Sequence, residues 1–95
     1  MYKQTLRQMR MMIRTRQYVM TVHAEEEMSD DELTIFDVER VILTGTIVER
    51  QIDKQSSEWK YLVAGELLHG EVVTVVAKLS IMGKLVIITV YREIP

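Results

Sequence analysis

The sequence of 95 residues contains no cysteine and only two histidines. The absence of cysteine excludes disulfide bonds, a thiol nucleophile and a metal site built from thiolates. His23 and His69 do not make a convincing zinc site unless several carboxylates converge on them, because zinc sites use three or four protein ligands. We therefore expect neither a metal nor another cofactor.

Long hydrophobic segments are also missing. No apolar run approaches the roughly 20 residues that a membrane-spanning helix needs. Arg10 and Arg14 interrupt the apolar cluster at residues 9–13, which would otherwise resemble the apolar part of a signal peptide. We therefore expect a cytoplasmic protein.

The short length favours one domain over residues 1–95. A chain of this size buries only about 60 to 65% of its unfolded surface, so we expect modest stability without a partner. Its hydrophobic content of 47% and charged content of 27% are ordinary for a globular protein and too apolar for intrinsic disorder.

Acidic residues are absent from the first 17 positions, although the whole chain has a net charge of −2. The basic residues of this segment are Lys3, Arg7, Arg10, Arg14 and Arg16. Residues 23–40 have the opposite bias, with eight acidic residues against Arg40 alone. Two interpretations stay open. Either the two segments are solvated helix faces that attract each other, or Arg7, Arg10 and Arg14 contact phosphate or an acidic partner.

Three helices are predicted in the first half of the chain. An apolar stripe with helical spacing predicts the first helix over residues 2–16, and it consists of Tyr2, Leu6, Met9 and Ile13. Thr21 is a candidate N-cap for a second helix, after an extended link or edge strand over residues 17–21. Residues 29–32 predict a break before the third helix.

The third helix has start and stop signals. Thr34 and Asp37 form a capping box, and the buried stripe that follows is Val38, Val41 and Ile42. Gly45 is expected to end this helix in the left-handed conformation.

The rest of the chain predicts strands. Residues 46–53, 59–67, 72–80 and 85–92 are rich in β-branched and aromatic side chains. Their short connections favour a meander. The predicted fold class is therefore α+β, with N-terminal helices packed on one antiparallel sheet of about four strands.

Two glycines allow the strand register to be predicted. If His69-Gly70 and Met82-Gly83 are two-residue turns, the second of them pairs Leu79 with Val86, Ala77 with Ile88 and Val75 with Val90. The first turn then places Tyr61 across from Lys78, on a face that also carries Trp59, Thr74, Thr89 and Tyr91. Whether the arginine-rich helix covers that face stays open.

Several of these segments resemble one family. The motifs are His23-Ala-Glu-Glu-Glu-Met28, the helix over 37–45, Trp59-Lys-Tyr61, Val76-Ala-Lys78 and the ending Ile87-Ile-Thr-Val-Tyr91. Over residues 18–92 the chain resembles family 4258 of the domains of unknown function. Its members resemble small bacterial toxins of the RelE, BrnT and MqsR kind, with two helices before an antiparallel sheet. The resemblance implies a toxin-like RNA endonuclease and a zinc-finger antitoxin similar to MqsA as its partner.

Cleavage of RNA by its own 2′-hydroxyl needs a base, a cation and an acid, but no metal. We assign His23 as the candidate base, Lys78 as the phosphate ligand, and Tyr61 and Tyr91 as base-stacking groups or proton donors. The alternative for each is structural. A histidine at a helix start is often only hydrogen-bonded, tyrosines are ordinary in strands, and His69 lies in a turn.

Two functional classes follow. The first is a toxin-like ribonuclease without metal, with RNA or the ribosome and an antitoxin as expected partners. The second is a non-enzymatic protein-interaction module of the same fold, for which a homodimer is another expected assembly. The low net charge favours the second class. The resemblance and the group of Tyr61, Lys78 and Tyr91 favour the first, which we prefer.

Overall fold

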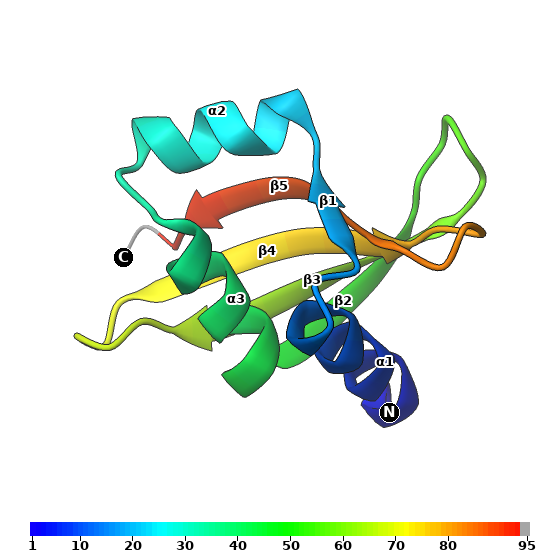
Figure 1. Cartoon of the computed structure of the whole chain (residues 1–95), viewed down its shortest axis with the longest axis horizontal. Coiled ribbons are helices and arrows are strands. Elements are labelled where there is room, and N and C mark those ends of the chain that lie inside the picture. The colour runs from blue at the N-terminus through cyan, green and yellow to red at the C-terminus, as the bar shows by residue number, and fades with distance from the viewer. Residues whose placement is uncertain (94–95) are drawn as a thin grey trace.

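The computed structural model describes residues 1–93 (Figure 1). Its elements are α1 (Lys3–Arg14), β1 (Tyr18–Met20), α2 (Val22–Asp30), α3 (Ile35–Thr44), β2 (Thr46–Ile52), β3 (Trp59–Glu66), β4 (Val72–Leu79) and β5 (Leu85–Arg92). The strands form one sheet in the order β1-β5-β4-β3-β2, in which only β1 runs parallel to its neighbour. The predicted α+β class is confirmed, and the short link after α1 adds a fifth, edge strand to the predicted four.

Helices α2 and α3 begin where local signals predict them. Thr21 Oγ1 accepts a hydrogen bond from Ala24 N at 3.0 Å. Thr34 and Asp37 form the predicted capping box, with bonds in both directions. Such bonds satisfy N–H groups that have no partner within the helix. None of the helices within residues 1–93 is long and apolar enough to cross a membrane.

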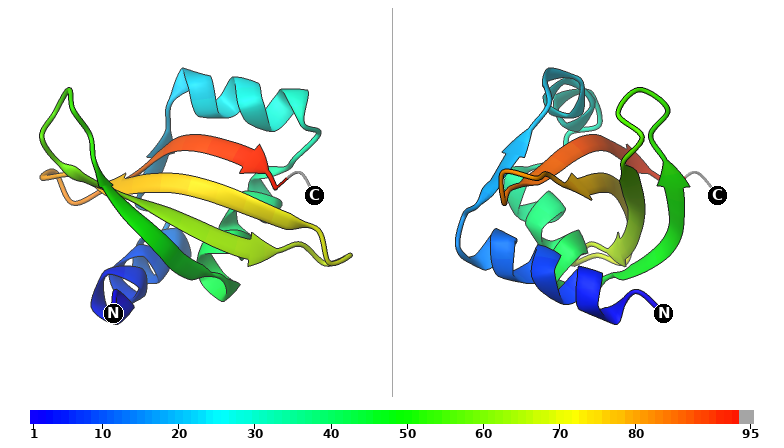
Figure 2. Two further views of the ribbon diagram at one scale, coloured as in Figure 1. Left: turned by 180° about the vertical axis from the view of Figure 1, so that it is seen from behind. Right: turned by 90° about the vertical axis from the view of Figure 1, so that its right-hand side faces the viewer.

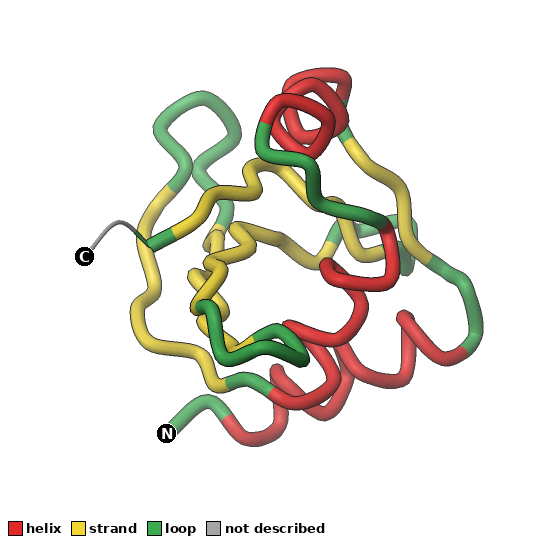
Figure 3. Tube along the Cα trace, turned by 90° about the vertical axis from the view of Figure 1, so that its left-hand side faces the viewer, coloured by secondary structure: helices red, strands yellow, loops and turns green. Residues whose placement is uncertain are grey.

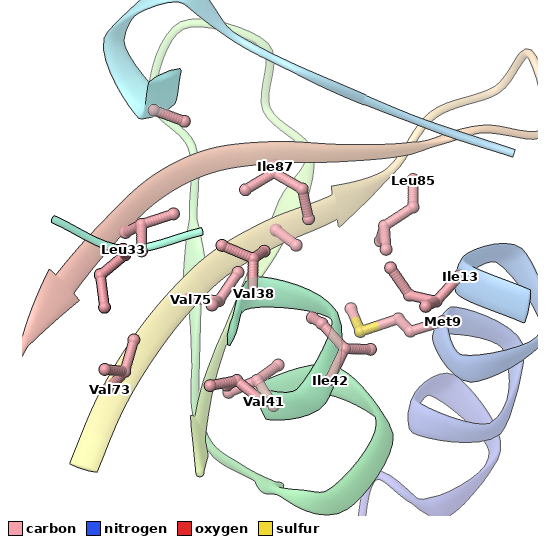
Figure 4. Packing of buried hydrophobic residues seen from close by; sticks show 14 of the residues in the cluster. Met9, Ile13, Leu33, Val38, Val41, Ile42, Val73, Val75, Leu85 and Ile87 are labelled. Carbon is pink, nitrogen blue, oxygen red and sulfur yellow. The ribbon is translucent and has the colours of Figure 1, made fainter. Parts of the chain in front are cut away.

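The hydrophobic core lies between the helices and one face of the sheet. Met9 of α1, Ile42 of α3 and Leu85 of β5 belong to one buried cluster (Figure 4). The sheet curves around α3 (Figure 3), and its other face has no helix over it within residues 1–93 (Figure 2). We call the face that carries Val63 and Val75 the helical face, and the opposite one the outer face. The arginine-rich helix α1 therefore does not cover the outer face.

The free edge of β5 is covered by α2. Thr21 Oγ1 donates to Ile88 O at 3.1 Å, and the carboxylate of Glu27 accepts a hydrogen bond from Val90 N at 3.1 Å. Further along, the Arg92 guanidinium donates to Asp31 O. Because β1 pairs with β5 only as far as Ile87, these bonds replace a strand partner along the rest of the edge.

The turn between β3 and β4 contains three residues rather than the predicted two. Leu67 N donates to Glu71 O at 2.8 Å, and Gly70 N donates to Leu67 O at 2.9 Å. Gly70 has φ +91°, a left-handed conformation that favours glycine in such turns. The extra residue shifts the register by one. Tyr61 therefore pairs with Ala77, and the predicted position across from Lys78 is wrong.

The turn between β4 and β5 also has three residues, but a bulge compensates for the third one. The ladder pairs Ala77 with Ile87 and then Val76 with Thr89, so that Ile88 has no opposite partner. The predicted pair of Val75 and Val90 is therefore confirmed. The predicted pairs of Leu79 with Val86 and Ala77 with Ile88 are wrong, and Leu85 and Ile87 are the buried residues instead.

Gly45 ends α3, but not in the predicted left-handed conformation, since its φ is −85°. Its role is close packing. A Cβ atom at this position would lie 2.3 Å from Ala64 O and 2.5 Å from Val41 O. At Gly65 of β3, a Cβ atom would lie 3.1 Å from Val41 Cα. The two glycines thus let the end of α3 lie directly on β3.

We predict that Gly45→Ala lowers the free energy of unfolding by about 1 to 3 kcal/mol, because backbone atoms must move to make room for the methyl group. Gly65→Ala should cost less, since its contacts are longer. Gly70→Ala is the control, because it has open space and only a backbone cost of about 1 kcal/mol. Urea denaturation of the three variants checks the order, and a Gly45→Ala protein as stable as the wild type would contradict it.

Candidate nucleic-acid interface

The basic residues of α1 form a stripe beside its apolar stripe. Lys3, Arg7, Arg10 and Arg14 are each one position after a residue of the apolar series Tyr2, Leu6, Met9 and Ile13. One residue turns a helix by about 100°, so the four basic side chains share one flank. They line one hollow of about 470 Å³ together with Leu6. We call these four residues the basic stripe, which is about 16 Å long at 1.5 Å per residue.

Arg10 also holds α1 against α3. Its Nε donates to Ile42 O at 3.1 Å, and its Nη2 donates to Gly45 O at 2.9 Å. Carbonyls at the end of a helix lack helical partners and carry partial negative charge, which a guanidinium complements. Arg10 is therefore both a predicted phosphate ligand and a structural anchor. The sequence could not reveal the second role, because the bonded carbonyls lie more than 30 residues further along the chain.

The basic stripe and the acidic helix α2 do not form ion pairs with each other. Within residues 1–93, the salt bridges involve Lys78, Arg92 and the two histidines as the cationic groups. Lys3, Arg7 and Arg14 are exposed. The interpretation in which the two charged segments attract each other is thus not realised as contacts between them.

Three aromatic side chains and one arginine gather beside the N-terminus of α1. The guanidinium carbon of Arg50 lies 3.8 Å from the centre of the Trp59 ring and 5.5 Å from that of Tyr2. Tyr2 meets Tyr61 edge-on, with ring centres 5.9 Å apart and planes at 72°. We call Tyr2, Arg50, Trp59 and Tyr61 the aromatic cluster. Arg50 and Tyr2 were absent from the predicted site, although the pairing of β2 with β3 places Arg50 opposite Tyr61.

A hollow of about 300 Å³ lies next to the aromatic cluster, and its lining consists of Ser57, Glu58, Trp59, Tyr61 and Leu79. Trp59 is 43% exposed, so part of its ring faces solvent. Ser57 has φ +61°, a conformation that costs a residue other than glycine about 1 to 3 kcal/mol. The hollow therefore combines an open aromatic surface with a strained, polar rim.

The predicted catalytic residues do not come together. Tyr61 lies on the helical face, because it pairs with the buried Ala77. Lys78 and Tyr91 lie on the outer face, since side chains alternate along each strand and Tyr91 pairs with Thr74. The three-residue turn between β3 and β4 causes this separation.

Lys78 ties the β2–β3 loop to β4. Its Nζ lies 3.1 Å from Glu58 Oε1 and 4.0 Å from Asp53 Oδ2, and its side chain is only 19% exposed. The pKa of the Asp53 carboxyl lies below its usual value, mainly because it accepts a hydrogen bond from Gln55 N and in part because Lys78 is near. Lys78 thus has carboxylate partners within the chain.

His23 lies at the other edge of the sheet from the aromatic cluster. Its Nε2 is 3.3 Å from Glu27 Oε1, and its side chain is 66% exposed. The same carboxylate oxygen accepts the hydrogen bond from Val90 N. His23 lies on α2 at the edge of β5, and β4 lies between β5 and the cluster strand β3, so His23 is not positioned to act on a molecule bound at the aromatic cluster.

We predict that Glu27→Ala lowers the free energy of unfolding by about 1 to 3 kcal/mol, because it leaves the buried N–H of Val90 without a partner. His23→Gln should change it by less than about 0.5 kcal/mol, since an exposed side chain is exchanged. Thermal and urea denaturation measure both. Equal losses for the two variants would mean that His23, and not only Glu27, holds α2 against β5.

Two further polar pairs are structural. Tyr18 Oη donates to Glu39 Oε2 at 2.5 Å, which links β1 to α3. Burial, followed by this hydrogen bond, raises the pKa of Tyr18 to about 12. In the β3–β4 turn, the pKa of the Glu71 carboxyl is lowered mainly by the hydrogen bond from Arg92 and in part by the hydrogen bond with His69.

Within residues 1–93, no three carboxylate or histidine side chains are grouped as metal ligands.

The structure therefore defines a small α+β domain with a basic helix flank and an aromatic cluster beside it. The chain belongs to the family described as Domain of unknown function (DUF4258), whose model matches residues 20–92. This confirms the predicted family. No curated protein and no solved structure matches the chain. The matched residues include α2, α3 and strands β2 to β5, whereas α1 precedes them.

Proposed function

We propose that the domain binds single-stranded RNA, with the RNA backbone along the basic stripe. The stripe itself is the observation that carries this proposal. Its four side chains line one hollow, and within residues 1–93 none of them forms a salt bridge with a carboxylate. Cations that are not neutralised within the chain bind phosphates and release the counterions of the nucleic acid.

The neighbouring aromatic cluster favours a single strand over a duplex. In a duplex the faces of the bases are stacked and hidden, whereas a single strand exposes them to aromatic side chains. Tyr2 of the aromatic cluster and Lys3 of the stripe line one further hollow together, so the cluster borders one end of the stripe. The choice of RNA over DNA rests on the expectation, stated from the sequence, that members of this family resemble the RelE, BrnT and MqsR toxins.

We further propose that the bound RNA is cleaved without a metal, as in a toxin-like endonuclease. The 2′-hydroxyl loses its proton to water as its oxygen attacks phosphorus, and the bond to the 5′-oxygen breaks, so that the leaving 5′-oxygen needs a proton. Arg50 and Tyr61, which lie opposite each other on β2 and β3, would stabilise the phosphorane and protonate the leaving oxygen, respectively. Arg50 takes the place that the sequence assigned to Lys78, and Tyr61 keeps the role of proton donor that the sequence assigned to Tyr61 or Tyr91. Lys78 and Tyr91 lie on the outer face.

The second candidate function is a protein-interaction module. It is favoured by the composition of the aromatic cluster, because Trp, Tyr and Arg contribute most to the energy of protein interfaces. The expected zinc-finger antitoxin or a second copy of the chain would be the partner in this case.

RNA binding tests the proposal directly. Arg7→Glu with Arg14→Glu should weaken binding of a labelled oligouridylate at least tenfold. It should also lower the slope of log affinity against log salt concentration by about two, because two phosphate contacts are lost. Fluorescence anisotropy over a range of salt concentrations measures both quantities. The control is Lys54→Glu with Lys84→Glu, which makes the same change in net charge in two exposed loops. RNA binding that is equal in both double variants would contradict the role of the stripe.

Cleavage is tested in cells. Induction of the wild type in a bacterial host should stop growth and degrade messenger RNA, and Arg50→Ala with Tyr61→Phe should restore growth. Lys78→Ala with Tyr91→Phe changes the outer face instead and should leave the arrest intact. Normal growth with soluble wild-type protein would exclude the nuclease. Recovery only in the second pair would return the site to the residues that the sequence predicts.

A further inference from the structure

The hollow beside Trp59 differs from the basic stripe in its chemistry. Its largest side chains are Trp59, Tyr61 and Leu79, and the acidic Glu58 lies at its rim. We propose that this hollow takes one unpaired base of a single RNA strand, stacked on Trp59, while the neighbouring phosphates contact α1. This proposal rests on the proposed function, because the same strand must bind the basic stripe.

Arg50 prepares Trp59 for stacking. Its guanidinium covers the indole ring at 3.8 Å from the β2 side. The hollow is lined by Trp59 but not by Arg50, and it includes Leu79 of β4, so it lies on the side of Trp59 away from β2. A guanidinium keeps its charge at any ordinary pH and stacks well on aromatic rings. The ring is thus held from one side and remains accessible from the other.

Tyr61 is the second aromatic wall of the hollow, and Tyr2 supports it from the start of α1. Tyr2 packs edge-on against Tyr61 and also contacts Arg50, so that a residue of the helix, one of β2 and one of β3 support one another. Rings fixed in this way lose little freedom when a ligand stacks on them. The binding surface therefore exists before RNA arrives.

Size and charge select a base rather than a phosphate. The volume of about 300 Å³ is at the lower end of the roughly 300 to 1,000 Å³ typical of small-molecule sites. Glu58 and Lys78 form an ion pair at 3.1 Å, so the rim offers a phosphate no cation that is free of a carboxylate partner. The carboxylate oxygens of Glu58 and the hydroxyl of Ser57 are acceptors for N–H groups at the edge of a base.

Trp59 makes the proposal testable without any variant, because it is the only tryptophan of the chain. The protein is titrated with oligouridylate, with oligoadenylate and with an abasic oligonucleotide that has the same number of phosphates. We expect the two oligonucleotides with bases to quench Trp59 emission and to bind about tenfold or more tightly than the abasic one. The abasic probe should still bind the basic stripe, without quenching.

Variants then locate the effect, with Trp59 as the reporter. Tyr61→Leu and Arg50→Met should each remove most of the preference for probes with bases, measured as the ratio of the affinity for oligouridylate to the affinity for the abasic probe. Lys60→Met is the matched control. It lies between Trp59 and Tyr61 on β3, points to the outer face and removes the same charge as Arg50→Met. Circular dichroism and thermal melting check that every variant is folded.

Three outcomes would overturn the proposal. Equal affinity for all three probes without quenching would reject base stacking while leaving RNA binding by α1 intact. Absence of binding to any probe would reject the proposed function as well. Loss of the preference in Lys60→Met as much as in Arg50→Met would show that the charge of β2 and β3, rather than the hollow, selects the probe.

Discussion

Successive side chains of a β-strand lie on opposite faces, so the register between β3 and β4 decides where Trp59 and Tyr61 point. The three-residue turn ending at Gly70 sets that register and places both rings on the helical face. With one residue fewer in the turn, both rings would be on the outer face, away from α1. Tyr2 would then have no ring to contact, although Arg50 would keep its place beside Trp59, because the pairing of β2 with β3 does not depend on that turn. The aromatic cluster thus depends on one turn that lies at the other end of the strand.

The aromatic cluster also depends on the position of α1, which Arg10 helps to fix. Its two hydrogen bonds to the end of α3 fix the rotation of α1 about its axis, which puts Met9 and Ile13 into the core and Lys3, Arg7 and Arg14 on the surface. The same bonds end where Gly45 allows α3 to approach β3. Because α1 precedes the residues that the family model matches, the aromatic cluster combines Tyr2 from outside that region with Arg50, Trp59 and Tyr61 from within it. The proposed RNA surface is therefore a joint property of both parts.

The features that could be predicted from the sequence, such as helix caps and buried helix positions, depend on residues close together in the chain. Thr21 and Thr34 were identified as caps because the bonded groups lie three positions away, and Val38, Val41 and Ile42 were identified as buried because helical spacing shows it. Glycine at Gly70 and Gly83 fits turns of two or three residues equally well, so the faces of β3 and part of β5 were assigned wrongly. Val75 and Val90 were paired correctly only because the extra turn residue and the bulge at Ile88 cancel. Arg50 was missed because its stacking on Trp59 depends on the register between β2 and β3, which the polar loop that joins these strands does not reveal.

A net charge of −2 argues against RNA binding only if the charges act together. They do not, because exposed charges are screened over about 10 Å at 0.1 M salt. The acidic helix α2 and the basic stripe lie on opposite sides of a molecule that measures 34 × 26 × 25 Å (Figures 1 and 2). An RNA strand at α1 therefore experiences mainly the stripe, while α2 adds a weak field that disfavours contact at the far side. Segregation of charge thus orients a polyanion instead of repelling it. The low net charge therefore no longer favours an interaction module over an RNA-binding domain. The main argument for a protein partner is then the composition of the aromatic cluster.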